Sequence, residues 1–239
     1  MHKGLQVRQV TMPAYRYAPL DGLTKAVQVG VGVSLAGEAV ACAMEFKLLS
    51  LLPQFEAGTV GAAEADAFDA MNLKIAIGLI ATFVIVAIMF LVWVHRANRN
   101  LHALEVREVE YTPGWAVGSW FIPILNIFRP YAIMREIWRG SRSPSNSAAE
   151  GHASVPASLG VWWGAWLVAG VLESLSASFV RGESPSMDDF KSSAYLSIGS
   201  SLLNFVAGVI IIVLIGTIAQ SQMRKKQGLA SQPPPRMET

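Results

Sequence analysis

Charged residues are scarce in this chain. They make up 15% of the 239 residues, whereas hydrophobic residues make up 52% and the mean hydropathy is +0.40. Soluble domains carry about a quarter charged residues, so this composition favours a protein that is dissolved in lipid. The net charge of +2 is small and no basic stripe is present, which argues against binding of nucleic acid.

Cysteine is almost absent, because Cys42 is the only one. A single thiol excludes an intramolecular disulfide, a CxxC redox pair and a cysteine-ligated zinc site. The sequence also lacks an HExxH helix, a Ser-His-Asp pattern and a phosphate-binding glycine loop. His95 and His102 share one side of a helix, but two histidines without a third ligand are not typical of a metal site. We therefore expect a protein that is not an enzyme and uses no cofactor.

Four long apolar segments are present instead, and each can cross a bilayer core of about 30 Å as a helix. They are residues 26–44, 75–94, 159–179 and 194–219. The second has no charged residue, and the fourth is followed by the basic group Arg224, Lys225 and Lys226. Single carboxylates, Glu38 and Glu173, interrupt the other two. The predicted fold class is all-α, a polytopic membrane protein with four transmembrane helices.

Lysine and arginine are concentrated in particular connections. Residues 1–25 carry four, residues 95–154 carry seven and the residues after Ala219 carry four, against four in the rest of the chain. Positively charged flanks are retained on the cytoplasmic side of a membrane. This asymmetry predicts that both termini are cytoplasmic and that the two outer connections, which are acidic, face the other side.

These boundaries divide the chain into three parts. They are a cytoplasmic segment 1–22, a transmembrane domain 23–223 and a disordered cytoplasmic tail 224–239. A cleavable secretory signal that ends near Ala41 is the rival interpretation of the first span, but Glu38 beside the cleavage site argues against it.

The connection between the second and third spans contains a shorter apolar segment, residues 114–128. As a straight helix it would rise only about 22 Å, and Pro123 interrupts it. If it crossed, every later basic flank would lie outside. We therefore predict that residues 114–138 form a re-entrant or interfacial segment, in which Pro130 opens a short amphipathic helix. Its apolar face would comprise Ile133, Met134, Ile137 and Trp138.

This segment also contains a recognisable pattern of aromatic residues, prolines and an asparagine. Its members are Trp115, Trp120, Phe121, Pro123, Asn126, Pro130 and Trp138. The pattern resembles the bacterial membrane proteins grouped as domain of unknown function 4328. The residues Arg96 to Leu101 and Tyr17 to Leu23 support the resemblance, which covers about residues 17–220. It implies a bacterial protein of the cytoplasmic membrane, and it implies no particular activity.

The predicted spans contain two carboxylates, Glu38 and Glu173, and one asparagine, Asn204. By helix rise, all three fall in the outer half of the membrane and could converge. A carboxylate in hydrocarbon must pair, face the bundle interior or stay protonated. A proton or cation site is one hypothesis. The alternative, which we prefer, is that Glu173 reaches the outer interface and Glu38 is a packing residue.

Several features suggest contacts with lipid or with another protein. Arg129, Arg135, Arg139 and Arg142 could bind anionic headgroups or could simply enforce the topology. A stripe of small residues from Gly30 to Ala41 predicts close helix packing, within one bundle or in a homo-oligomer. The leading hypothesis is a non-enzymatic membrane module that presents residues 115–138 to lipid or a membrane partner. A small proton, ion or solute transporter that uses Glu38, Glu173 and Asn204 is the alternative.

Overall fold

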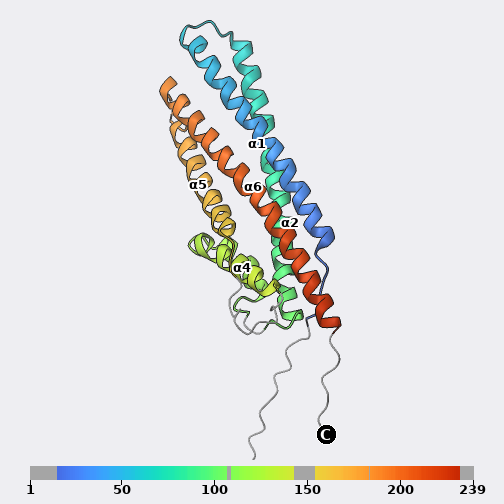
Figure 1. Ribbon diagram of the computed structural model, residues 1–239. Coiled ribbons are helices and arrows are strands. Elements are labelled where there is room, and N and C mark those ends of the chain that lie inside the picture. Colours follow the sequence, from blue (N-terminus) through green and yellow to red (C-terminus); the bar gives the residue numbers. More distant parts are fainter. Residues whose placement is uncertain (1–14, 107–108, 143–153, 183, 232–239) are drawn as a thin grey trace, which may run out of the picture.

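The computed structural model describes residues 15–106, 109–142, 154–182 and 184–231, and all regular structure in this part of the chain is helical. Figure 1 shows a long bundle with a short helical segment at one end. The elements are α1 (Asp21–Glu56), α2 (Ala62–Ala103), α3 (Pro113–Gly118), the 3₁₀ helix η1 (Ser119–Phe121), α4 (Leu125–Ser141), α5 (Ala157–Phe179) and α6 (Met187–Ala230).

Four of these helices, α1, α2, α5 and α6, are long and apolar enough to cross a membrane. Each contains one of the predicted spans, which confirms the predicted fold class. Large apolar side chains of α2 point outward, and Ile77, Ile80 and Phe83 are exposed by 59%, 64% and 60%. Such a continuous apolar surface suits acyl chains and not water.

The four long helices pack in the order α5, α6, α1, α2, so that α6 and α1 hold the inner places. Close approach depends on glycine. A Cβ atom at Gly30 would lie 2.8 Å from Cγ2 of Val86, and one at Gly208 would lie 2.6 Å from Cδ2 of Leu35. Both distances are shorter than real contacts of a Cβ atom. The small residue Gly30 of the predicted stripe therefore packs α1 against α2 within a single bundle.

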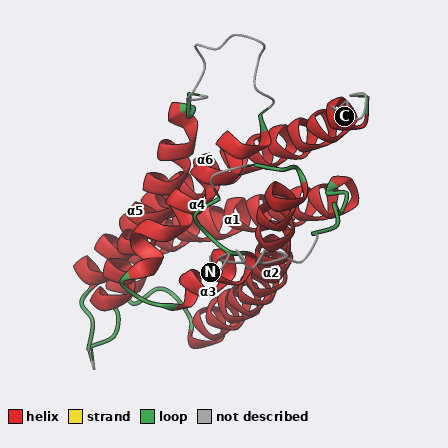
Figure 2. Ribbon diagram, turned by 90° about the horizontal axis from the view of Figure 1, so that it is seen from below, coloured by secondary structure: helices red, strands yellow, loops and turns green. Residues whose placement is uncertain are grey.

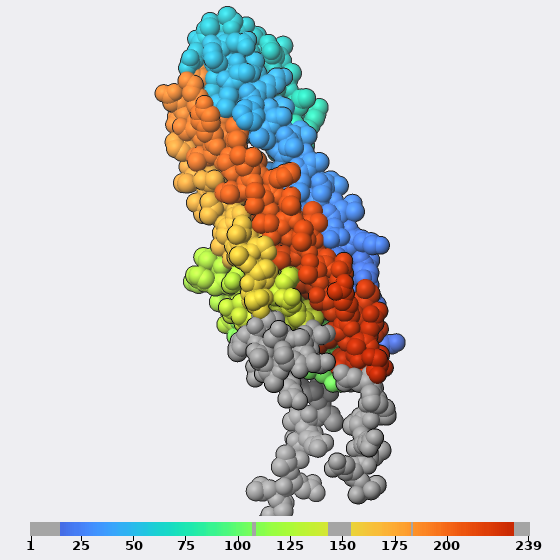
Figure 3. All heavy atoms as spheres, viewed as in Figure 1, coloured from blue at the N-terminus to red at the C-terminus, as the bar shows by residue number. Residues whose placement is uncertain are grey.

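The start of α1, the end of α2 and the end of α6 lie at the same end of the bundle, and so do α3 and α4 (Figure 2). We call this the α4 end. There α4 contacts α2, α5 and α6, so it bridges helices that lie apart in the row. The space-filling view shows the α4 segment beside the start of α5 (Figure 3). Its buried side chains Ile133, Met134 and Ile137 are 0% exposed.

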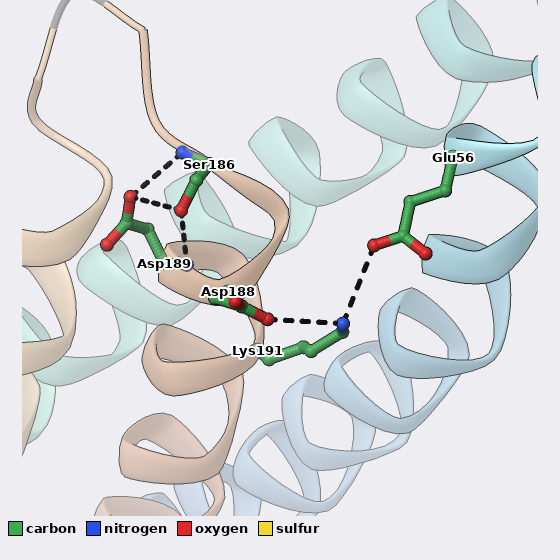
Figure 4. Close-up of polar contacts among 5 residues, drawn as sticks. All are labelled: Glu56, Ser186, Asp188, Asp189 and Lys191. Atoms are coloured by element: carbon green, nitrogen blue, oxygen red, sulfur yellow. Dashed lines mark hydrogen bonds and ion pairs between the residues drawn. The ribbon is translucent and has the colours of Figure 1, made fainter.

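The opposite end of the bundle carries a group of exposed polar contacts (Figure 4). Ser186 and Asp189 form a capping box that starts α6, with each side chain bound to the other residue's backbone N–H. Lys191 lies 3.6 Å from Glu56 at the end of α1 and 3.3 Å from Asp188. Because exposed ion pairs contribute at most about 1 kcal/mol, this end depends mainly on apolar packing.

Two helix boundaries differ from the sequence prediction. Pro130 does not open a helix, because α4 begins five residues earlier at Leu125 and Pro130 lies inside it, buried. Similarly, α6 continues to Ala230, so residues 224–230 of the predicted tail are helical. Residues 232–239 and residues 1–14 lie outside the described part of the chain.

Candidate functional site

A buried polar network fastens the α4 end of the bundle. The side chain of Asn100 donates to the carbonyl of Ala18 at 2.8 Å and accepts from its N–H at 2.9 Å. Asn100 also donates to Oε1 of Gln222 at 2.9 Å, and Gln222 donates to the carbonyl of Ala97 and to the hydroxyl of Ser141. Asn100, Gln222 and Ser141 are all 0% exposed. The network thus joins the segment before α1 to α2, α4 and α6 without any charged group.

The chain leaves α2 through a tight turn. Glu105 adopts a positive φ of 56°, and the N–H of Val106 bonds to the carbonyl of Leu101 at 3.1 Å. This is the helix-ending arrangement in which a left-handed residue reverses the chain. The turn sends residues 109–112 back along α4. Thr112 then caps α3 by accepting from the N–H of Trp115, and Pro113 takes the first helical position.

The α3–η1–α4 segment is anchored by an aromatic cluster. The ring of Trp120 meets Phe90 of α2 at 5.6 Å and Trp163 of α5 at 5.8 Å, both edge to face. Trp166 is 6.4 Å away. Nε1 of Trp163 donates to the carbonyl of Ile127 at 2.8 Å and so satisfies a backbone group of α4. Because Phe90, Trp163 and Trp166 lie within the predicted spans, η1 is docked at the level of the membrane helices.

The other side of the segment is apolar and exposed. The exposed fractions are 72% for Phe121, 73% for Ile124 and 67% for Phe128, and Trp115 is 55% exposed. Pro123 is exposed in the turn between η1 and α4, whereas Asn126 is partly buried, with Oδ1 unpartnered among the described residues. We call Trp115, Phe121, Ile122, Ile124 and Phe128 the apolar rim.

Glu136 of α4 fixes the connection before α3. Its carboxylate accepts from the N–H of Glu110 at 2.8 Å and from the N–H of Tyr111 at 3.4 Å, and Nδ2 of Asn98 lies 3.4 Å away. Burial raises the pKa of the Glu136 carboxyl above its ordinary value, and the charge of Glu110 acts in the same direction, against the lowering effect of the hydrogen bonds. These hydrogen bonds fix the backbone of Glu110 and Tyr111, so that their side chains lie over the first turns of α4.

These side chains form a small pocket. Glu110, Tyr111, Trp115, Leu125 and Arg129 line a cavity of about 240 Å³. Nη1 of Arg129 lies 3.8 Å from Oε1 of Glu110, and the guanidinium stands over the Tyr111 ring at 5.1 Å. Burial raises the pKa of Tyr111, and the nearby Glu110 adds to this effect, so its hydroxyl stays protonated at neutral pH. The pocket therefore offers one cation, one anion and two aromatic rings.

The four predicted arginines fall into two groups. Arg129 belongs to the pocket, whereas Arg135 and Arg139 lie on the outward face of α4 and Arg142 directly follows the helix, and these three are exposed. The guanidinium of Arg135 lies 5.9 Å from the ring of Tyr131, and that of Arg142 lies 5.6 Å from Trp138. We call Arg135, Arg139 and Arg142 the arginine stripe. No described carboxylate forms an ion pair with the stripe.

The predicted intramembrane polar group is only partly assembled. The hydroxyl of Ser201 on α6 donates to Oε2 of Glu38 on α1 at 3.0 Å. Glu173 on α5 is exposed, and it lies close enough to Glu38 and to Glu45 for the charges to interact. Asn204, one turn beyond Ser201, makes no hydrogen bond to a described side chain of this group. The structure thus places Ser201, and not Asn204, against Glu38.

The two histidines lie apart from any cluster of ligands. The ring of His102 stacks on Tyr15 at 4.8 Å, and His95 is exposed on α2. Within the described ranges, no three His, Cys, Asp or Glu side chains come together as a group that could hold a metal ion.

Sequence reasoning missed Gln222, Glu136 and Tyr111. Glu136 had a detectable signal, because it lies on the same side of the amphipathic helix as the buried residues Ile133 and Ile137. Gln222 had no such signal, because it directly follows an apolar span, where polar residues are usually exposed to solvent. Asn100 lay inside the Arg96 to Leu101 motif, but its partners are far away in the chain.

Comparison with known proteins places the chain in a family. No curated protein and no solved structure matches it. A family model described as Domain of unknown function (DUF4328) matches residues 57–220, which include the whole α1–α2 connection, all of α2 to α5 and most of α6. The match covers the aromatic cluster, the pocket and the arginine stripe. This integral membrane protein therefore belongs to the DUF4328 family.

Proposed function

We propose that the protein is a non-enzymatic interface module of the bacterial cytoplasmic membrane, which binds anionic lipid headgroups through the arginine stripe of α4. In this proposal the α4 end faces the cytoplasm, together with both termini, and the α3–η1–α4 segment is re-entrant. The observation that carries it is the pairing of two exposed surfaces on one rigid segment. The apolar rim suits acyl chains, and the arginine stripe suits the phosphates above them.

The rigidity of α4 supports this function. One face of the helix is fixed by Ile133, Met134 and Ile137, which are fully buried. The opposite face presents Arg135 and Arg139 one turn apart, free of described acidic partners. Nearby aromatic rings limit the motion of the guanidinium groups, so less side-chain entropy is lost when a phosphate binds. Bidentate contacts between arginine and phosphate are strong in such a partly desolvated setting.

Neutralising two arginines of the stripe tests the proposal. The double variant Arg135→Gln/Arg139→Gln should bind phosphatidylglycerol or cardiolipin roughly thirtyfold more weakly, since each basic residue near an anionic surface contributes about 1 kcal/mol. Affinity is measured by native mass spectrometry of the full chain in detergent.

The matched control is Lys74→Gln/Arg181→Gln, which removes the same charge at the opposite end of the bundle from two exposed side chains. Equal affinities of the wild type and the stripe variant would refute the proposal. A loss of similar size in the control would show that only net charge matters, and this would refute it as well.

A second function is favoured by the hydrogen bond between Ser201 and Glu38, which links α6 to α1 inside the predicted spans. We propose as the alternative that Glu38 and Glu173 pass protons or cations through the membrane, with Asn204 or a second copy of the chain completing the path. Intramembrane carboxylates commonly mark such pathways. The expected result is loss of flux into proteoliposomes in Glu38→Gln and Glu173→Gln. Glu64→Gln, on the exposed surface near the start of α2, is the control. Unchanged flux in both variants rules this alternative out.

A further inference from the structure

The pocket beside Arg129 differs in charge from the arginine stripe. The stripe is purely cationic, whereas the pocket sets one guanidinium against one carboxylate, at 3.8 Å. This separation is too long for a direct hydrogen bond. The side chains of Arg129 and Glu110 are 43% and 70% exposed, so both can still bind other groups.

The pocket is a preformed site whose walls are fixed by the fold. Glu136 holds the backbone of Glu110 and Tyr111 by two hydrogen bonds, and this places both side chains opposite Arg129. Arg129 in turn stands on the Tyr111 ring. A ligand that enters here therefore meets a cation and an anion whose backbones are already held on opposite walls of the pocket, which lowers the cost of organising the site.

The size and surroundings of the pocket indicate a lipid headgroup. Its volume of about 240 Å³ is smaller than the sites that enclose whole drug-sized ligands, which hold about 300–1,000 Å³. It opens onto the apolar rim, since Trp115 belongs to both and Leu125 follows the exposed Ile124. A small polar group could thus be held in the pocket while attached acyl chains lie along Ile124 and Phe128.

We propose that this pocket binds the headgroup of a zwitterionic phospholipid with a primary ammonium group, its phosphate on Arg129 and its ammonium on Glu110 beside the face of Trp115. Charge complementarity selects this occupant. An anionic headgroup without a cation would meet the repulsion of Glu110, and a bare cation would meet Arg129. A phosphate and an ammonium joined by two carbons satisfy both side chains at once, and the indole face adds a cation–π contact.

The inference rests on the proposed placement of α3–η1–α4 at the lipid interface, but it concerns a different lipid class and different residues from the stripe.

The test measures binding of dioleoyl phosphatidylethanolamine, phosphatidylcholine and phosphatidylglycerol to the full chain in detergent by native mass spectrometry. Glu110→Gln should weaken binding of phosphatidylethanolamine about tenfold, because one charge-assisted hydrogen bond is lost. Binding of phosphatidylglycerol should stay equal or become tighter. Arg129→Gln should weaken binding of the two zwitterionic lipids, whose phosphate it holds, and should change binding of phosphatidylglycerol much less.

Controls separate this inference from the proposed function. Arg135→Gln/Arg139→Gln should lose phosphatidylglycerol and keep phosphatidylethanolamine. If phosphatidylethanolamine binds to the wild type, Glu110→Gln and Arg129→Gln with equal affinity, the pocket assignment is overturned, whatever the result for the stripe variant.

If phosphatidylcholine binds to the wild type as tightly as phosphatidylethanolamine, the role of Glu110 is overturned. Soluble glycerophosphoethanolamine should bind at least tenfold more weakly than the lipid, and equal binding would overturn a lipid occupant. Glu110 is exposed, so its variant should fold even if Arg129→Gln does not.

Discussion

Gln222→Leu is expected to lower the free energy of unfolding by about 3 kcal/mol, because it leaves several buried polar groups without partners at about 1–3 kcal/mol each. The Gln222 side chain accepts from Asn100 and donates to Ala97 and Ser141 where no water reaches them. Leucine has a similar volume, so the loss reports the hydrogen bonds more than the packing. The apparent melting temperature in detergent, followed by circular dichroism, should fall by roughly 6–12 °C.

Gln220→Leu is the matched control for this variant. Gln220 lies two residues away on the exposed side of α6, so the same substitution there removes no buried hydrogen bond. Its melting temperature should stay within about 2 °C of the wild type, the shift that corresponds to a surface substitution of about 0.5 kcal/mol. Equal stability of Gln222→Leu and Gln220→Leu would mean that the network contributes nothing to the fold.

Trp120→Ala should undock the α3–η1–α4 segment from the long helices. Removing a buried tryptophan costs about 3–5 kcal/mol, and Trp120 touches Phe90, Trp163 and Trp166 at once. Because it is only partly buried, we expect a loss near about 3 kcal/mol. This loss is measured as a fall in the melting temperature in detergent, followed by circular dichroism. A cysteine introduced at Ala116, which is 0% exposed in α3, in a Cys42→Ser background should also react faster with a water-soluble maleimide in the Trp120 variant.

Trp115→Ala provides the comparison, since this tryptophan belongs to the same motif but is 55% exposed. Its removal should change the stability little, by about 0.5 kcal/mol. If both tryptophan variants are equally stable, the aromatic cluster does not anchor the segment. A strong loss in Trp115→Ala alone would instead place the anchor at the pocket.

The membrane helices could be predicted from local composition because lipid imposes a local rule. A segment that crosses hydrocarbon must satisfy its own backbone, so about twenty apolar residues predict a helix without knowledge of its neighbours. The spans 75–94 and 194–219 follow this rule and lie inside α2 and α6. The rule says nothing about how far a helix continues beyond the membrane, which is why α6 extends past the predicted end of the domain.

The prediction at Pro130 was wrong for a reason that is also local. A proline inside a helix removes one hydrogen bond and is ordinarily unfavourable. In α4 only the carbonyl of Asn126 loses its helical donor at Pro130, and the burial of Ile133, Met134 and Ile137 holds the helix in place around it. Contacts of α4 with α5 and α6 therefore stabilise a helix that includes Pro130, and residues 125–141 alone give no indication of these contacts.

The pocket and the polar network were hidden for a different reason. Asn100 and Gln222 are 122 residues apart, and Glu136 reaches the backbone of Glu110 across 26 residues. Neither pair produces a periodic pattern, and all of these residues are common on solvated surfaces. The four arginines were grouped as one set because they are close in the chain. The helix turns Arg129 toward Glu110 and the other three outward, and only three-dimensional positions separate the two groups.

The hydrogen bond between Asn100 and Gln222 constrains the order in which the helices can assemble during synthesis. The second helix enters the membrane with a carboxamide whose partner belongs to the final helix, which the ribosome delivers much later. Until then one N–H of the Asn100 amide must stay hydrated or bind a temporary partner, whereas its two hydrogen bonds to Ala18 can already form. The buried network at the α4 end is therefore completed only when the last helix is in place.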